Sequence, residues 1–133
     1  YIYTGEVKYL DTAKKVAHYF VANVAASNWL PEVDFRAPEK GCHFDSTAGA
    51  AASCGLIEIA NHVPENEKDF YLDSAIRLLK SMEKEWCDWS EENDSILQNG
   101  TERYGEDPMH IIYGDYFFAE AILKLRGNDF LPW

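Results

Sequence analysis

The sequence predicts an all-α fold of two helical hairpins, and three observations support this prediction. The pattern Tyr-Leu-Asp-Thr-Ala at residues 9–13 returns as Tyr-Leu-Asp-Ser-Ala at residues 71–75, so the chain contains an internal repeat of 62 residues. Each copy begins a stretch in which apolar residues recur every three to four positions, which is the spacing of an amphipathic helix. Each stretch is followed, after a long loop, by a second one made mainly of small and apolar residues.

We expect each copy of the repeat to open an amphipathic helix with one buried face and one solvated face. The apolar face of the first helix is predicted to contain Leu10, Ala13, Ala17, Phe20, Val21 and Val24. The apolar face of the second is predicted to contain Ala75, Leu78, Leu79, Met82 and Trp86. Charged residues such as Lys14 and Glu83 occupy the opposite faces.

The helices that follow have a different character. Residues 45–60 carry no charge between Asp45 and Glu58, and residues 115–125 begin with an almost wholly apolar run that Gly127 is expected to terminate. A helix that is small or apolar on every side is buried on every side. The predicted order is therefore outer, inner, outer, inner, and two hairpins alone leave the inner helices short of neighbours.

The loops that join outer to inner helices, at residues 27–44 and 90–114, are long and rich in Pro, Gly, Asn and Asp. Long loops inside a compact helical array usually carry function. Hence we expect any site to be built on these loops.

Composition excludes several functions. The chain has 23 acidic and 12 basic residues and a net charge of −11, which argues against nucleic acid or an anionic membrane surface as the partner. The apolar runs are too short to span a bilayer. The three cysteines show no paired or metal-binding spacing, and the four histidines are isolated, so we expect no metal and no cofactor.

Three segments resemble one enzyme family. Residues 45–58, beginning Asp-Ser-Thr-Ala, resemble the Asp-Ser-Ser-Ala-Ala-Ala helix of unsaturated glucuronyl hydrolases, glycoside hydrolase family 88. Residues 111–121 are similar to the aromatic-Gly-Asp-Tyr helix near the C-terminus of that family, and residues 29–38 are similar to the loop before its first motif. The three occur in the family's order, and together the resemblance covers essentially the whole chain.

The resemblance implies a single barrel of six helical hairpins, of which residues 1–133 are the C-terminal portion. It implies a glycoside hydrolase that removes unsaturated glucuronic acid from lyase-generated oligosaccharides by hydrating the C4=C5 double bond. The partner it implies is an unsaturated uronic-acid oligosaccharide. The family's catalytic aspartates fall outside the chain, so we expect the chain alone to be inactive. The compartment, cytoplasmic or periplasmic, stays open.

Two aspartates are candidate sugar-binding residues. Asp45, followed by Ser46, and Asp115, flanked by Tyr113 and Tyr116, both stand at the start of an inner helix. Each carboxylate is either an N-cap that accepts backbone N–H bonds and complements the helix dipole, or a group that lines the pocket. Aromatic hydroxyls beside a carboxylate suit sugar recognition, which favours the second aspartate for a binding role.

The turn at residues 98–101 is a further candidate. In related enzymes a His-Gly-Thr-like turn stands here, and Asn99 takes the place of the His, with Thr101 completing the match. The turn is either an ordinary polar connection or a rim that contacts the departing sugar. The sulfate-binding Ser-x-x-Ser-x-Lys pattern of streptococcal-type members is absent from this loop, so the resemblance does not extend to a preference for sulfated substrates.

Two other hypotheses remain open. A free-standing helical-repeat interaction or binding module would be a stable monomer, or a homodimer that covers the exposed inner helices. An unsaturated rhamnogalacturonyl hydrolase would share the barrel, although the Asp-Ser-Thr-Ala motif favours the glucuronyl family.

Overall fold

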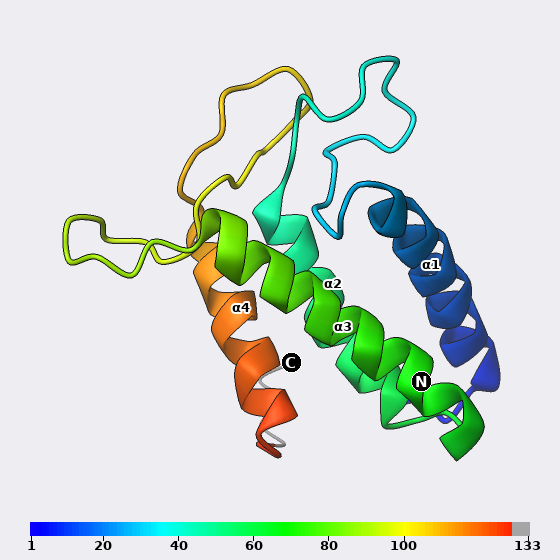
Figure 1. Cartoon of the computed structure of the whole chain (residues 1–133). Helices are drawn as coiled ribbons and strands as arrows, with labels where there is room; N and C mark the ends of the chain where they lie inside the picture. The colour runs from blue at the N-terminus through cyan, green and yellow to red at the C-terminus, as the bar shows by residue number, and fades with distance from the viewer. Residues whose placement is uncertain (129–133) are drawn as a thin grey trace.

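The computed structural model describes residues 1–128, and this part of the chain is helical, as predicted. It contains α1 (Val7–Ala26), α2 (Ser46–Ala60), α3 (Glu65–Trp86) and α4 (Ile112–Leu125) (Figure 1). The only β pairing among the described residues is three isolated bridges in the loops. No helix in this region is both long and apolar enough to cross a membrane.

The amphipathic faces of α1 and α3 lie where the apolar spacing predicts them. Ala17, Val21 and Val24 of α1 are buried. On α3 the buried set includes all five predicted residues, Ala75, Leu78, Leu79, Met82 and Trp86. The predicted start of α3 is wrong: the helix begins at Glu65, six residues before the repeated pattern. Glu65 and Glu67 stabilise this extra segment because acidic side chains in a first turn complement the helix dipole.

α2 is wedged between α3 and α4. It packs closely against both, whereas α3 and α4 make almost no contact with each other. Gly49 allows the close approach, because a Cβ at this position would lie 2.6 Å from Met82 Sδ and 2.9 Å from Pro31 Cγ. Ser53 is also fully buried and donates its hydroxyl to Gly49 O at 2.8 Å, so no polar group is stranded at this point.

α1 contacts α2 only lightly. Side chains also link it to α3, through a Lys14–Glu67 ion pair at 2.5 Å and through His18 Nε2, which lies 3.0 Å from the Tyr71 hydroxyl. A groove of about 700 Å³ with mainly apolar walls lies between α1 and α2. One face of α4 is also open and bears Ile112, Tyr113, Tyr116, Ala119, Ile122, Leu123 and Leu125. Within residues 1–128 the two inner helices thus differ: α2 packs on both α3 and α4, whereas α4 packs mainly on α2 and keeps an exposed apolar face.

Charged side chains lie inside the α2–α4 contact. The Lys124 side chain is only 7% exposed, and its Nζ donates to Glu58 Oε2 at 3.1 Å and lies 3.5 Å from Glu120 Oε1. Glu58 also meets His62 Nε2 at 3.1 Å. A buried lysine requires such partners, so this cluster fixes the register of α4 on α2.

The predicted stop of α4 at Gly127 is confirmed. Gly127 has φ +83°, and its N–H donates to Lys124 O at 3.0 Å. The Asn128 N–H reaches Leu123 O at 3.0 Å, which completes a glycine-terminated helix end.

Candidate functional site

The two long loops meet at one end of the molecule. The first loop, residues 27–45, leads into the N-terminus of α2, and the second, residues 87–111, leads into the N-terminus of α4 (Figure 1). We call this the loop end. It places every candidate site residue from the sequence at or beside the start of an inner helix.

Asp45 joins the two loops. Its Oδ1 accepts a hydrogen bond from Thr47 N–H at 3.0 Å and so caps α2, which confirms the N-cap interpretation. The same oxygen accepts from Thr101 N–H in the other loop at 3.2 Å. Thr101 is 7% exposed, and its hydroxyl donates to Phe44 O at 2.7 Å. Asp45 and Thr101 therefore form a cross-link between loops that are more than fifty residues apart in sequence.

Two opposing effects act on the Asp45 carboxyl. Burial raises its pKa, while hydrogen bonds from the backbone N–H groups of Thr101, Thr47 and Ala48 partly offset the rise. The net direction is upward. The carboxylate is thus a partly desolvated acceptor whose position the helix start and the second loop determine together.

Asn99 and Ser46 form the next link. Asn99 adopts a left-handed backbone with φ +63°, and its carbonyl accepts the Ser46 N–H at 3.0 Å. The next residue, Gly100, has no room for a side chain, because a Cβ there would lie 3.0 Å from both Met109 O and Ile111 Cγ1. Ser46 is 1% exposed, and its hydroxyl oxygen has no hydrogen-bond partner among the described residues. These contacts make the Asn-Gly-Thr turn a structural joint of the loop end.

Asp115 does not cap α4, so the N-cap interpretation is wrong for this residue. Ile111 is the N-cap, and Asp115 lies one turn inside the helix. Its Oδ1 accepts the Leu97 N–H at 2.7 Å and its Oδ2 accepts the Ser95 hydroxyl at 2.8 Å. The carboxylate thus reaches back to the second loop, because that loop folds over the first turn of α4.

The two tyrosines near Asp115 differ in environment. Tyr113 is 64% exposed and Tyr116 is 38% exposed. Partial desolvation and a hydrogen bond with Glu120 raise the pKa of Tyr116. Residues 113 and 115 point to opposite sides of a helix, so the structure separates the exposed Tyr113 hydroxyl from the Asp115 carboxylate.

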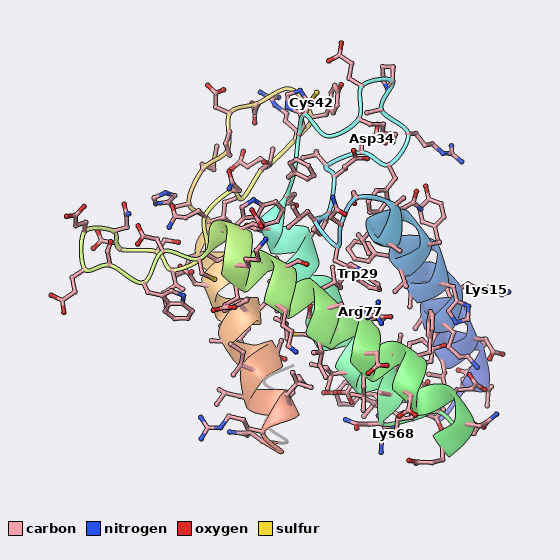
Figure 2. All side chains as sticks on the ribbon, viewed as in Figure 1. Lys15, Trp29, Asp34, Cys42, Lys68 and Arg77 are labelled. Carbon is pink, nitrogen blue, oxygen red and sulfur yellow. The ribbon has the colours of Figure 1, made fainter. Side chains whose placement is uncertain are left out.

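Two further contacts, one at the loop end and one beside the middle of α3, were not predicted. The His43 and Tyr104 rings, one from each loop, meet edge to face with centroids 4.8 Å apart. At the base of the first loop, the Arg77 guanidinium of α3 lies 5.4 Å from the centre of the Trp29 ring (Figure 2). Asn28 and Trp29 both have positive φ, and the Trp29 N–H donates to Val24 O at 2.7 Å. No local sequence pattern indicates these pairs, since their partners come from distant segments.

The side chains of the described loop end are arranged to line a site. Both aspartates are engaged by donors from the loops, and exposed aromatic and polar groups surround them. In residues 1–128 no three His, Cys, Asp or Glu side chains are grouped to hold a metal ion. The arrangement can position loops and offer hydroxyl and aromatic surfaces to a ligand.

Comparison with known proteins names a family. No protein-family profile matches the chain. The chain is 31% identical over 131 residues to an unsaturated glucuronyl hydrolase from Bacillus sp. (strain GL1), covering 93% of this chain and 34% of that protein. A crystal structure of unsaturated glucuronyl hydrolase from Bacillus sp. GL1 superposes with a TM-score of 0.86 at 30% identity, over 94% of this chain and 35% of that one. A structure of UGL with dGlcA-Glc-Rha-Glc gives a TM-score of 0.87, also at 30% identity, over the same shares.

The chain is similar to unsaturated glucuronyl hydrolases in sequence and in fold. It spans about a third of the length of these hydrolases. The resemblance drawn from the three motifs is therefore confirmed, as is the fold class, two helical hairpins of an α/α toroid.

The sugar-binding role of the candidate residues in this chain stays a prediction. The structure brings Asp45, Ser46, Asn99 and Thr101 into one hydrogen-bonded joint. It places Tyr113, Asp115 and Tyr116 on the first turns of α4 beside that joint.

Proposed function

We propose that this chain is the C-terminal part of an unsaturated glucuronyl hydrolase, in which it supplies two of six helical hairpins. The whole protein would remove unsaturated glucuronic acid from the end of an oligosaccharide. The observation that carries the proposal is the agreement of two comparisons with the Bacillus sp. GL1 hydrolase, 31% identity over 93% of the chain and a TM-score of 0.86 over 94% of it.

The proposed reaction is hydration of a vinyl ether. A carboxylic acid donates a proton to the C4=C5 double bond at C4, and water adds at C5. The product is a hemiketal, which opens and releases the remaining sugar chain as an alcohol. This chemistry requires an accessible carboxyl group with a raised pKa and a second group that tunes it.

The described aspartates suit positioning better than proton transfer. Asp115 accepts two hydrogen bonds from the second loop, and Asp45 caps α2 while it holds Thr101. We therefore assign the catalytic acid to the remainder of the hydrolase and assign the wall and rim of the saccharide pocket to this chain, with Tyr113 the most exposed candidate contact.

A chimaera tests the proposal. The segment of the Bacillus sp. GL1 hydrolase that aligns with this chain is replaced by residues 1–133, and loss of the double-bond absorbance of an unsaturated uronyl disaccharide is followed. We expect the chimaera to consume the double bond and the 133-residue chain alone to leave it intact. Consumption by the chain alone would show that it contains its own catalytic acid and would contradict the assignment.

A further inference from the structure

The sequence contains a single Asn-Gly pair, Asn99–Gly100, and this pair lies in the joint of the loop end. In such a pair the backbone nitrogen of the glycine can attack the side-chain carbonyl carbon of the asparagine, because glycine has no Cβ to hinder the approach. Packing requires the glycine here, since a Cβ at residue 100 would lie 3.0 Å from Met109 O. The loop end therefore contains a reactive amide pair for a structural reason.

The reaction of this pair is deamidation through a cyclic imide. A bond forms between Gly100 N and Asn99 Cγ, the bond from Cγ to Nδ2 breaks, and the Gly100 N–H proton leaves with the side-chain nitrogen as ammonia. Water then opens the imide at either of its carbonyl carbons, which gives aspartate or isoaspartate at residue 99. In isoaspartate the backbone passes through the side-chain carbonyl carbon and is longer by one carbon atom.

Hydrogen bonds hold both backbone groups that the imide ring would contain. The Gly100 N–H donates to Met109 O at 2.9 Å, and the Met109 N–H donates to Gly100 O at 2.7 Å. The Asn99 carbonyl, whose carbon atom joins the same ring, accepts the Ser46 N–H at 3.0 Å. Gly100 is buried as well. Ring closure removes the proton of the first bond and moves the carbonyl that accepts from Ser46, so the folded joint opposes the reaction.

We propose that Asn99 is a site of spontaneous deamidation that the folded loop end protects, and that its conversion to isoaspartate disconnects the start of α2 from the second loop. The reaction proceeds from locally open states in which Gly100 and Met109 are unpaired. The lengthened backbone of the product displaces the Asn99 carbonyl from the Ser46 N–H. It also displaces the Thr101 N–H, which donates to Asp45 Oδ1 at 3.2 Å. One covalent change therefore weakens two links between the loops.

The protection is measured by peptide mapping with mass spectrometry, which detects the replacement of the side-chain NH₂ by OH. The 133-residue chain and the chimaera, each shown to unfold cooperatively in urea, are incubated at mildly alkaline pH beside a synthetic peptide of residues 95–105. We expect both folded proteins to deamidate at residue 99 at least about tenfold more slowly than the peptide, since a factor of ten corresponds to about 1.4 kcal/mol of opening free energy. Equal rates in the peptide and in either folded protein would overturn the proposal.

A matched pair of variants tests whether the loop-end joint provides the protection. Thr101→Val removes the hydroxyl that donates to Phe44 O at 2.7 Å, and it should accelerate deamidation of the folded chain about fivefold, as expected for the loss of one hydrogen bond. Glu91→Ala, in the exposed part of the same loop, should leave the rate unchanged. Equal acceleration by the two variants, or none by Thr101→Val, would overturn the proposal.

The consequence of the modification is tested on the purified isoaspartate form. It is obtained by deamidation in urea, refolding and chromatography, and it is compared with Asn99→Asp, which has the same charge and a backbone of normal length. We expect the isoaspartate form to unfold at a lower urea concentration than Asn99→Asp. Equal midpoints would show that the lengthened backbone does not break the joint and would overturn this part of the proposal. These measurements record mass and stability, so they do not depend on the hydrolase reaction.

Discussion

The Asp115 carboxylate holds the second loop onto α4, and its removal should destabilise the fold measurably. Asp115→Ala deletes the acceptor of the Leu97 N–H, at 2.7 Å, and of the Ser95 hydroxyl, at 2.8 Å. Leu97 is 1% exposed, so water cannot easily replace the lost acceptor of its N–H. A buried donor without a partner costs about 1–3 kcal/mol, and a hydrogen bond to a charged group contributes about 1.5–3 kcal/mol.

We therefore expect Asp115→Ala to lower the free energy of unfolding by about 2–4 kcal/mol. Asp115→Asn should cost less, about 1–2 kcal/mol, because the amide oxygen still accepts the Leu97 N–H and the amide N–H can donate to the Ser95 hydroxyl oxygen. The Ser95 hydroxyl can then donate to Leu97 O, which already lies 3.2 Å away. If the free energy of unfolding increases from Asp115→Ala to Asp115→Asn to wild type, the effect of losing the acceptor can be distinguished from the effect of losing the charge.

Equilibrium urea unfolding measures these values. The control is Glu91→Ala in the exposed part of the same loop, which should shift the unfolding free energy by less than about 0.5 kcal/mol. A double-mutant cycle with Ser95→Ala should give a coupling of about 0.5–3 kcal/mol. If Asp115→Ala matches Glu91→Ala, the carboxylate does not hold the loop and this reasoning is refuted.

Four other changes probe the helices and the loop end. Gly49→Ala should destabilise by about 1–2 kcal/mol in urea unfolding, because its Cβ would lie 2.6 Å from Met82 Sδ, whereas Gly55→Ala on the same helix meets nothing within 4 Å and should stabilise by about 0.5–1 kcal/mol. Thr101→Val removes the donor to Phe44 O and should cost about 1 kcal/mol in the same assay; a neutral result would show that the two loops are held elsewhere. Burial raises the pKa of Asp45, so protonation of its carboxyl stabilises the fold. This contribution to the free energy of unfolding is full below the ordinary aspartate pKa and is lost as pH rises through the raised value. In a pH series of urea unfolding, the free energy of unfolding should therefore decline less with rising pH for Asp45→Asn than for wild type. Residues 88–107 carry seven acidic and one basic side chain, so kcat/KM of the chimaera should be lower for a sulfated than for an unsulfated unsaturated disaccharide, with the difference narrowing at high salt; equal values at low salt would contradict a role for this charge.

The helices can be predicted from the sequence because the buried face of a helix requires apolar residues at regular spacing. Ala17, Val21 and Val24 recur at the spacing of one helix face, and that face is buried. The start of α3 could not be predicted in the same way. Residues 65–70 are mostly charged and carry no apolar period, and dipole complementarity extends the helix through them.

The loop end follows from sequence only in part. Asp45 caps α2 through Thr47, two residues away, and local spacing predicts such contacts. The partners of Asp115 lie 18 and 20 residues earlier, and Thr101 meets Asp45 across 56 residues. Long-range pairs depend on how the loops pack, and a single sequence contains no periodic signal for them. The same holds for Lys124, whose partner Glu58 lies on another helix.

The central claim is that this chain can serve as part of an unsaturated glucuronyl hydrolase. Its most direct test is the rate at which the chimaera with the Bacillus sp. GL1 hydrolase removes the double-bond absorbance of an unsaturated disaccharide, compared with the same hydrolase lacking the replaced segment. We predict measurable turnover for the chimaera and none for the truncated protein. A chimaera that has the mass expected of the full toroid and unfolds cooperatively, yet leaves the absorbance unchanged, would contradict the claim.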